Sequence, residues 1–221
     1  MVGNRQQRQF AVEAAKELEM MLTAGNSLEM RLCITHAIDG FYGKQRNLPI
    51  TPIYKDIIEL YAQTKIGYTP TLLVTHGGAL AEKYFFTKNQ VHKDPKVVRF
   101  IPDNVIQKMT RRRDWFRDDE YNLSSVAADA VNIMRAGGRV GVGSHGQFQG
   151  LGFHWELWAL KSGGMTEMEA LRAATIGGAE IIGIASDVGS IEFGKLADFI
   201  ILNEDPLDDI RNTNEIKYVV K

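Results

Sequence analysis

Residues 140–152 read VGVGSHGQFQGLG and hold the side chains of this sequence best suited to chemistry. The pattern predicts a short strand that opens into a glycine-rich loop carrying His145, Gln147 and Gln149. An imidazole accepts a proton or binds a metal near neutral pH, and amides can orient a substrate carbonyl. We therefore take His145 as the candidate catalytic residue and metal ligand, and Gln147 as a substrate contact. Alternatively, His145 caps a tight glycine turn and the glutamines tie the loop backbone.

Two further side chains are candidates for substrate binding. His76, in VTHGG, follows an expected strand, so it should point toward the same edge of the sheet as His145. Arg46, in GKQRNLP, carries a guanidinium that can bind a carboxylate through two parallel hydrogen bonds. This group is always charged and has no free lone pair, so it would repel a divalent cation. Arg46 thus indicates either carboxylate recognition or a site that has lost its metal.

The remaining histidines fit structural roles better. His36, in CITHAI, is expected to be packed or to face solvent, and His92 lies in a charged segment that should be solvated. His154 begins a helical segment that also contains Trp155 and Trp158. These tryptophans could line the mouth of a pocket, but packing in the core is the commoner role of such aromatic residues.

The composition limits the class of protein. The 221 residues are 44% hydrophobic and 24% charged with a net charge of −1, which is typical of a globular domain. Without a basic excess, the sequence shows no footprint for binding nucleic acid or an anionic membrane. A single cysteine, Cys33, excludes an internal disulfide and a CxxC zinc site. No apolar run approaches the ~18 residues of a membrane-spanning helix.

The apolar spacing predicts alternating helices and strands that must position these residues. The third expected helix begins at Pro52, and the last opens with a capping box formed by Thr166 and Glu169. Residues 76–120 have weak periodicity and are expected to form a long loop. The expected helices are 5–18, 27–38, 52–64, 123–135, 153–164 and 166–175, and the expected strands lie within 20–25, 39–49, 68–75 and 139–144.

Alternation of helices with buried strands indicates an α/β protein with a parallel sheet, either open or closed into a barrel. Residues 1–185 form about four βα units on this interpretation. Residues 186–221 change character, because β-rich segments alternate with Gly, Asp and Pro turns. We therefore expect two domains, the second a small β element.

Residues 173–202 carry the pattern A-A-T-x-x-G-A-x-x-x-G followed by G-S-I-E-x-G-K-x-A-D-x-x-x-L. This pattern resembles the amidohydrolase superfamily. With residues 68–75, 140–166 and 205–213, the chain looks like its imidazolonepropionase- or prolidase-like members, which are often fused to a TolB-type propeller. The resemblance covers essentially the whole chain but only the C-terminal half of a family member.

The resemblance implies a metal-dependent (β/α)8 barrel flanked by a small β-sandwich. Residues 1–185 would hold about strands five to eight of the barrel, and residues 186–221 would form part of the sandwich. The family's first-strand His-x-His pair and fourth-strand lysine or glutamate ligand would lie before Met1. Four βα units cannot close a barrel and leave open strand edges. We therefore expect a fragment that pairs with a missing N-terminal half or another chain, as an oligomer.

The resemblance also assigns positions to the candidate residues. His145 stands where the family has the strand-eight aspartate that takes a proton from the attacking water, so ligation would be altered here. The subgroup's glutamate–histidine pair, whose histidine is a metal ligand, is replaced by Gln45 and Arg46. Lys195 and Asp198 match the sandwich turn and are expected to be structural.

The implied activity is hydrolysis of a C–N bond in a small cyclic amide, imide or dipeptide-like substrate. A divalent metal, zinc foremost, activates the water in the full-length family. The replacement at Gln45 and Arg46 leaves a second possibility open, a catalytically degenerate amidohydrolase-fold protein without a competent metal site. An unrelated flavodoxin-like binding domain is disfavoured by the pattern in residues 173–202.

Overall fold

The computed structural model describes residues 4–25, 27–75, 78–111, 116–145 and 148–221. Within them the chain alternates helices with short strands, in agreement with the expected α/β class. The α-helices are α1 (Arg5–Glu17), α2 (Met30–Asp39), α3 (Lys55–Thr64), α4 (Ala81–Lys88), α5 (Pro95–Phe100), α6 (Asp103–Thr110), α7 (Leu123–Arg135), α8 (Leu151–Ser162), α9 (Glu167–Ala174) and α10 (Ile176–Ile181). The strands are β1 (Thr23–Ala24), β2 (Gly43–Gln45), β3 (Gly67–Thr69), β4 (Phe199–Leu202) and β5 (Ile216–Val220), and the 3-10 helices are η1 (Leu72–Val74), η2 (Val91–Lys93), η3 (Asp118–Glu120) and η4 (Ile210–Asn214).

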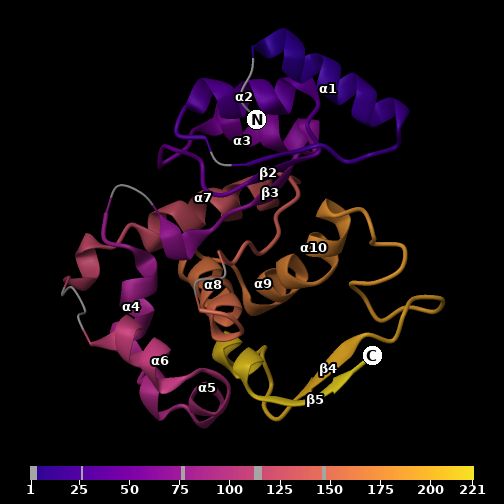
Figure 1. Ribbon diagram of the computed structural model, residues 1–221. Coiled ribbons are helices and arrows are strands. Elements are labelled where there is room, and N and C mark those ends of the chain that lie inside the picture. The colour runs from indigo at the N-terminus through magenta and orange to yellow at the C-terminus, as the bar shows by residue number, and fades with distance from the viewer. Residues whose placement is uncertain (1–3, 26, 76–77, 112–115, 146–147) are drawn as a thin grey trace.

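The first three strands form a parallel sheet in the order β1-β2-β3. A single parallel bridge between Tyr68 and Val140 adds a fourth position beside β3. Helices α1 to α3 gather near the N-terminus above this sheet, whereas the β4–β5 hairpin lies at the opposite end with the C-terminus (Figure 1). The parallel sheet is confirmed, whereas assignment to half of a barrel stays a prediction.

The two faces of the sheet differ in side-chain size. Ala24, Lys44, Tyr68 and Val140 are neighbours across the strands and all are buried. Tyr68 meets Tyr61 of α3 edge to face, with ring centroids 5.9 Å apart, so this face packs on the helices.

The opposite face of the sheet carries glycines because α10 approaches it closely. A Cβ placed on Gly67 would lie 2.8 Å from the side chain of Ile181, and one on Gly141 would lie 3.0 Å from it. Neither position leaves room for a side chain without displacing Ile181. Gly43 shares this face, where it lies against Thr23 of β1.

The expectation of a long loop over residues 76–120 was wrong. Helices α4, α5 and α6 and two 3-10 turns occupy most of its described part. Phe85 and Phe86 of α4 are buried, and Asp94 caps α5 by accepting hydrogen bonds from the backbone amides of Lys96 and Val97. These helices are too short to show several periods of apolar spacing, although the cap Asp94 followed by Pro95 is a local start signal.

Two expected strands are shorter than the sequence indicates. The strand at 68–75 ends at Thr69, and residues 72–74 form η1 instead. The strand at 139–144 is reduced to the bridge at Val140. Short apolar runs resemble strands and buried turns equally, so periodicity alone could not separate the two.

The helix expected to start at Pro52 begins later, at Lys55. The Thr51–Pro52 bond is cis, and the amide of Ile53 donates to Asp129 Oδ1 at 3.1 Å instead of entering a helix. By contrast, the helix at 123–135 is confirmed as α7.

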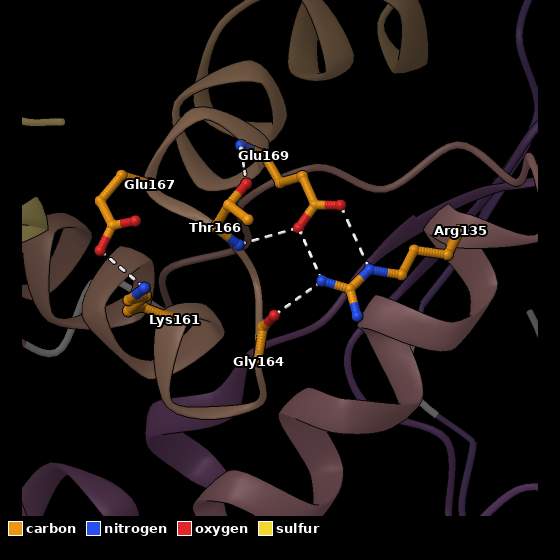
Figure 2. Close-up of polar contacts among 6 residues, drawn as sticks. All are labelled: Arg135, Lys161, Gly164, Thr166, Glu167 and Glu169. Atoms are coloured by element: carbon orange, nitrogen blue, oxygen red, sulfur yellow. Dashed lines mark hydrogen bonds and ion pairs between the residues drawn. The ribbon is translucent and has the colours of Figure 1, made fainter.

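The turn between α8 and α9 contains the capping box expected from the sequence. Thr166 Oγ1 accepts from the amide of Glu169, whose carboxylate accepts from the amide of Thr166 (Figure 2). The same carboxylate pairs with Arg135 of α7, which also donates to the carbonyl of Gly164 at 2.8 Å. The Arg135 guanidinium and the amide of Thr166 lower the pKa of Glu169 to about 2. The network joins α7 to the start of α9.

The C-terminal segment forms an antiparallel pair, β4 with β5, as a β element was expected there. Its apolar side chains are largely exposed, and so are Ile191, Phe193 and Leu196 before it. Division of the chain at residue 185 into two domains stays a prediction. Among the described residues no helix is long and apolar enough to span a membrane.

The close packing of α7 against α8 generates a first prediction. A Cβ on Gly163 would overlap the backbone and side chain of Ala127. Gly163→Ala should therefore lower the free energy of unfolding by about 1–3 kcal/mol, measured by denaturant titration. Gly25→Ala is the matched control, because a Cβ there meets nothing within 4 Å. Equal stability of the two variants would show that the two helices separate without cost.

Burial of His36 generates a second prediction. His36 of α2 is 2% exposed, packs on Phe41 at a ring distance of 4.5 Å, and neither ring nitrogen has a hydrogen-bond partner in the described structure. Burial, with the nearby cations Arg8 and Lys44, lowers its pKa to about 4. The folded state resists protonation, so stability should be full above pH ~6.5 and decline toward pH 4, by at most about 1.4 kcal/mol per pH unit.

The test is denaturation of His36→Leu at several pH values. This variant should lose part of the acid-side decline, and His92→Gln, a change at an exposed histidine, should keep all of it. His154, whose pKa is also lowered to about 4, leaves a residual slope in His36→Leu. Parallel curves for His36→Leu and the parent chain would rule out the assigned role of His36.

Candidate functional site

The segments that carry Arg46 and His145 lie on either side of the end of β3. The amide of Arg46, directly after β2, donates to the carbonyl of Thr69 at 2.9 Å. On the other side, the amide of Gly141 donates to the carbonyl of Tyr68 at 3.0 Å. Gly143 then packs so closely on the carbonyl of Pro70 that a Cβ could not be placed there. The parallel sheet therefore brings both segments to its carboxyl edge.

Arg46 is half-buried and has a φ of 67°, in the left-handed region that residues with a Cβ rarely adopt. Such a conformation persists only where surrounding contacts hold it, and here the bond to Thr69 does so. Arg46 forms no ion pair with any described carboxylate. Its guanidinium is thus available to an anionic ligand, although contact with a substrate stays a prediction.

Lys44 adds a second cation beneath this edge. It is fully buried on β2, and its Nζ donates to the carbonyl of Gly25 at 3.1 Å and to that of Gln45 at 2.6 Å. Burial lowers its pKa, and the charge of Arg46 acts in the same direction. Neither cation is neutralised by a carboxylate in the described structure, so the end of β2 disfavours a metal ion and favours an anion.

His145 is exposed and follows Ser144 in the segment that leaves the sheet. This place, beyond a strand's carboxyl end, suits a group that reacts with a ligand. Of the other candidates, His76 and Gln147 fall outside the described residues, so their predicted roles are untested. Gln149 is exposed just before α8.

An open groove of about 600 Å³ lies beside the same edge. Thr69 and Val142 contribute from the sheet, and Phe153 of α8 and Ile181 of α10 contribute from the helices. Asp198 also lines it, with Phe199 and Ile200 of β4. Its walls are mainly apolar with few polar groups, as in sites for small organic molecules.

The buried carboxyl group of Glu156 holds the backbone next to this edge. It was not among the residues singled out from the sequence. Glu156 of α8 is fully buried and accepts hydrogen bonds from the amides of Leu72 and Leu73, the latter at 3.1 Å. Burial raises its pKa to about 8, while the two amides oppose that rise. An acidic residue between Trp155 and Leu157 in an apolar helix was the available signal, because buried carboxylates need partners.

Asn47 makes the equivalent connection from β2. Its side-chain amide donates to the carbonyl of Thr71 at 2.9 Å, and its Oδ1 accepts from the amide of Thr71 at 2.9 Å. The amides of residues 71, 72 and 73 are therefore all bonded to side chains from other segments. Unlike Glu156, this connection lacked a sequence signal, because it joins residues 24 positions apart.

The described residues do not form a metal site on their own. Among them, no group of three His, Cys, Asp or Glu side chains could hold an ion. The two cations at the end of β2 make that edge still less suitable. His145 as a metal ligand stays a prediction that requires further ligands from elsewhere.

The histidines and tryptophans assigned to structural roles are packed or exposed as expected, whereas the structural role of Lys195 and Asp198 stays a prediction. His36 is packed, and His92 is exposed. His154 Nδ1 lies 3.1 Å from Thr213 Oγ1, Trp155 stacks between Phe85 and Phe148, and Trp158 donates to the carbonyl of Ile210. Lys195 Nζ donates to Ser190 Oγ at 2.6 Å within the turn before β4.

Comparison with known proteins gives a family match over most of the chain. The profile of the amidohydrolase family matches residues 56–221. A segment of 40 residues is 55% identical to the imidazolonepropionase of Symbiobacterium thermophilum. This segment makes up 18% of this chain and 9% of that protein.

Solved structures agree in fold at low identity. A Xaa-Pro dipeptidase with methionine in its active site has a TM-score of 0.67 at 20% identity, covering 99% of this chain and 47% of its own. A prolidase-like protein from Bifidobacterium longum has a TM-score of 0.68 at 20% identity, and the match covers 98% of this chain and 49% of that protein. The A. niger ochratoxinase has a TM-score of 0.67 at 19% identity, and the match covers 99% of this chain and 44% of the ochratoxinase. The chain thus spans about half the length of these structures.

The family match includes the pattern in residues 173–202 and the segment that carries His145. The solved structures extend the same fold over nearly all of this chain. The resemblance inferred from the sequence is confirmed, and the chain belongs to the amidohydrolase family.

Proposed function

We propose that this chain provides part of the active site of a hydrolase that cleaves a C–N bond in a small cyclic amide, imide or dipeptide-like substrate. The observation that supports this most directly is the position of His145, beyond the carboxyl edge of a parallel sheet in an amidohydrolase-family chain. In this class of reaction water adds to the carbonyl carbon, the C–N bond breaks, and the leaving nitrogen takes up a proton.

The proposed roles of the residues follow from their chemistry. The His145 imidazole accepts a proton from the attacking water and can return it to the leaving nitrogen. Arg46 binds a carboxylate of the substrate, since its guanidinium has no ionic partner among the described side chains. The apolar groove holds the remainder of the substrate. His76 and Gln147 are further proposed substrate contacts.

Amidohydrolases generally use a divalent metal, and zinc is the ion we expect in the full-length family. The described residues of this chain do not fit such an ion, because no three of their His, Cys, Asp or Glu side chains lie together and because the Arg46 guanidinium repels a cation. A metal at this site would need ligands beyond them, with His145 as the ligand that we propose from this chain. The roles proposed for His145 and Arg46 do not depend on it.

A second candidate function is favoured by the positive charge at the end of β2. Arg46 and Lys44 place two cations where the family resemblance would put metal-binding chemistry. A member that keeps the fold but binds a ligand without hydrolysis would show this arrangement. Hydrolysis assays with added metal separate the two candidates.

We also propose that further polypeptide covers the exposed apolar surface, as the counterpart of the other half of the solved relatives. Ile191, Phe193 and Leu196 are exposed, and so are Ile200 and Val219 of the hairpin. Exposed apolar surface of this extent is characteristic of interaction sites. The proposal is also supported by the match of this chain to only about half the length of these solved structures.

The activity is tested with purified chain, Xaa-Pro dipeptides and a cyclic imide, with and without added Zn²⁺ or Mn²⁺. We expect hydrolysis that falls by about 10²–10⁴-fold in His145→Ala, the contribution of a general base. His92→Ala, at an exposed residue of η2, should keep full activity. A chain that is inert under all conditions would favour the non-catalytic candidate, and equal loss in both variants would contradict the role of His145.

The surface is tested by light scattering after size-exclusion chromatography. The chain, of 24.7 kDa, should form associated species, because its apolar surface has no covering partner. Phe193→Asp should shift the distribution toward the monomer. Leu28→Asp, at an exposed leucine before α2, should leave it unchanged. A chain that is monomeric throughout would contradict an apolar interface at this hairpin.

A further inference from the structure

We propose that Glu156 is a positioning residue, which acts with Asn47 to fix the backbone of residues 71–73 and thereby the relative placement of the Arg46 and His145 segments. This inference rests on the proposed function, because it concerns the same edge of the sheet. It adds two residues that have no expected contact with substrate. Each step follows from contacts within the described residues.

The first step concerns the turn itself. After β3 ends at Thr69, the chain no longer bonds to a neighbouring strand. The amides of Thr71, Leu72 and Leu73 are buried, and such groups need acceptors. Asn47 supplies one acceptor and Glu156 supplies two. The path of the turn is therefore determined by two side chains, Asn47 from the segment after β2 and Glu156 from α8.

The second step connects this turn to Arg46. Asn47 is the next residue in the chain, and it forms a paired hydrogen bond with both backbone groups of Thr71. Arg46 itself donates from its amide to Thr69. Two successive residues are thus bonded to the segment that leaves β3. Any movement of residues 71–73 would be transmitted to the unusual backbone conformation at Arg46.

The third step connects the turn to His145. The Cβ position of Gly152, in the first turn of α8, lies 3.5 Å from Ser144 Oγ and 3.9 Å from a methyl of Leu73. Ser144 immediately precedes His145, and Gly143 packs on the carbonyl of Pro70. Glu156 lies one turn further along the same helix. Its bonds to Leu72 and Leu73 therefore hold α8, the turn and the His145 segment together.

The carboxylate has no competing partner that would account for its burial. In the described structure it forms no ion pair, and its hydrogen-bond donors are the two backbone amides. The phenol of Tyr68 is the titratable group that faces it from β3. A carboxylate buried with only backbone donors is costly unless both bonds form, so the turn and the carboxylate stabilise each other.

The test compares Glu156→Gln with Asp129→Asn in the full chain. Asp129 of α7 is a matched control, because it is also a buried carboxylate that accepts from a backbone amide, that of Ile53. Both changes replace one carboxyl oxygen by an amide nitrogen and keep the shape of the side chain. The readouts are the NMR resonances of the His145 imidazole and the hydrogen-exchange rates of individual amides.

We expect Glu156→Gln to shift the His145 resonances and to speed exchange of the Leu72 and Leu73 amides by about tenfold or more. Asp129→Asn should speed exchange at Ile53 and leave His145 unchanged. The resonances of His92, exposed on η2, should stay fixed in both. Unchanged His145 resonances in Glu156→Gln, or equal shifts in both variants, would overturn the proposal.

Asn47→Ala provides a second, independent variant if Glu156→Gln does not fold. It releases the Thr71 amide from the other side and should also shift the His145 resonances. No shift in that variant would overturn the proposal. None of these readouts depends on catalysis, so absence of hydrolysis would count against the proposed function without affecting this result.

Discussion

The hydrogen bonds between the buried Glu156 carboxylate and the amides of Leu72 and Leu73 are the constraint on which the carboxyl edge of the sheet depends. The strands β1, β2 and β3 of the parallel sheet are only two or three residues long, so the sheet itself holds little of the edge in place. Where the strands end, hydrogen bonds from side chains hold the backbone instead. Glu156 and Asn47 complete the turn after β3, and Asp129 does the same for the segment before α3.

The electrostatics of the edge distinguish this chain from a self-sufficient metal enzyme. Lys44 and Arg46 place positive charge at the end of β2, and the described part of the chain has no carboxylate that neutralises it. Glu156, an acidic residue close beneath the edge, accepts hydrogen bonds from backbone amides and has a pKa raised to about 8 by burial. Such a site is suited to an anionic ligand, which agrees with a substrate that carries a carboxylate.

Much of the fold could be predicted from the sequence where a pattern ran long enough. Helix α7 and the capping box at Thr166 and Glu169 follow from apolar spacing and local cap chemistry. The 173–202 pattern led to the family. Helices α4 to α6 were missed because each has one or two turns, and the strand ends were misplaced because apolar runs such as LLV suit a buried turn as well as a strand.

The candidate site was predictable only in part. The segments of Arg46 and His145 meet at one edge because parallel strands share a direction, which a pattern of alternating elements can show. The contacts that hold this edge could not be foreseen, since Asn47 and Glu156 reach residues 24 to 84 positions away. The apolar surroundings of Glu156 in the sequence indicate a buried carboxyl group, but the identity of its partners depends on the tertiary arrangement.

The central claim is that the edge bounded by Arg46 and His145 binds a small anionic substrate of a C–N hydrolase. Titration of isotope-labelled chain with N-acetylproline, a carboxylate that carries an amide, tests it most directly by NMR. The account predicts saturable shifts at the Arg46 side chain and at the amides of Thr69 and Val142 in the adjoining groove. Shifts confined to other surfaces, or none at millimolar ligand, would contradict it.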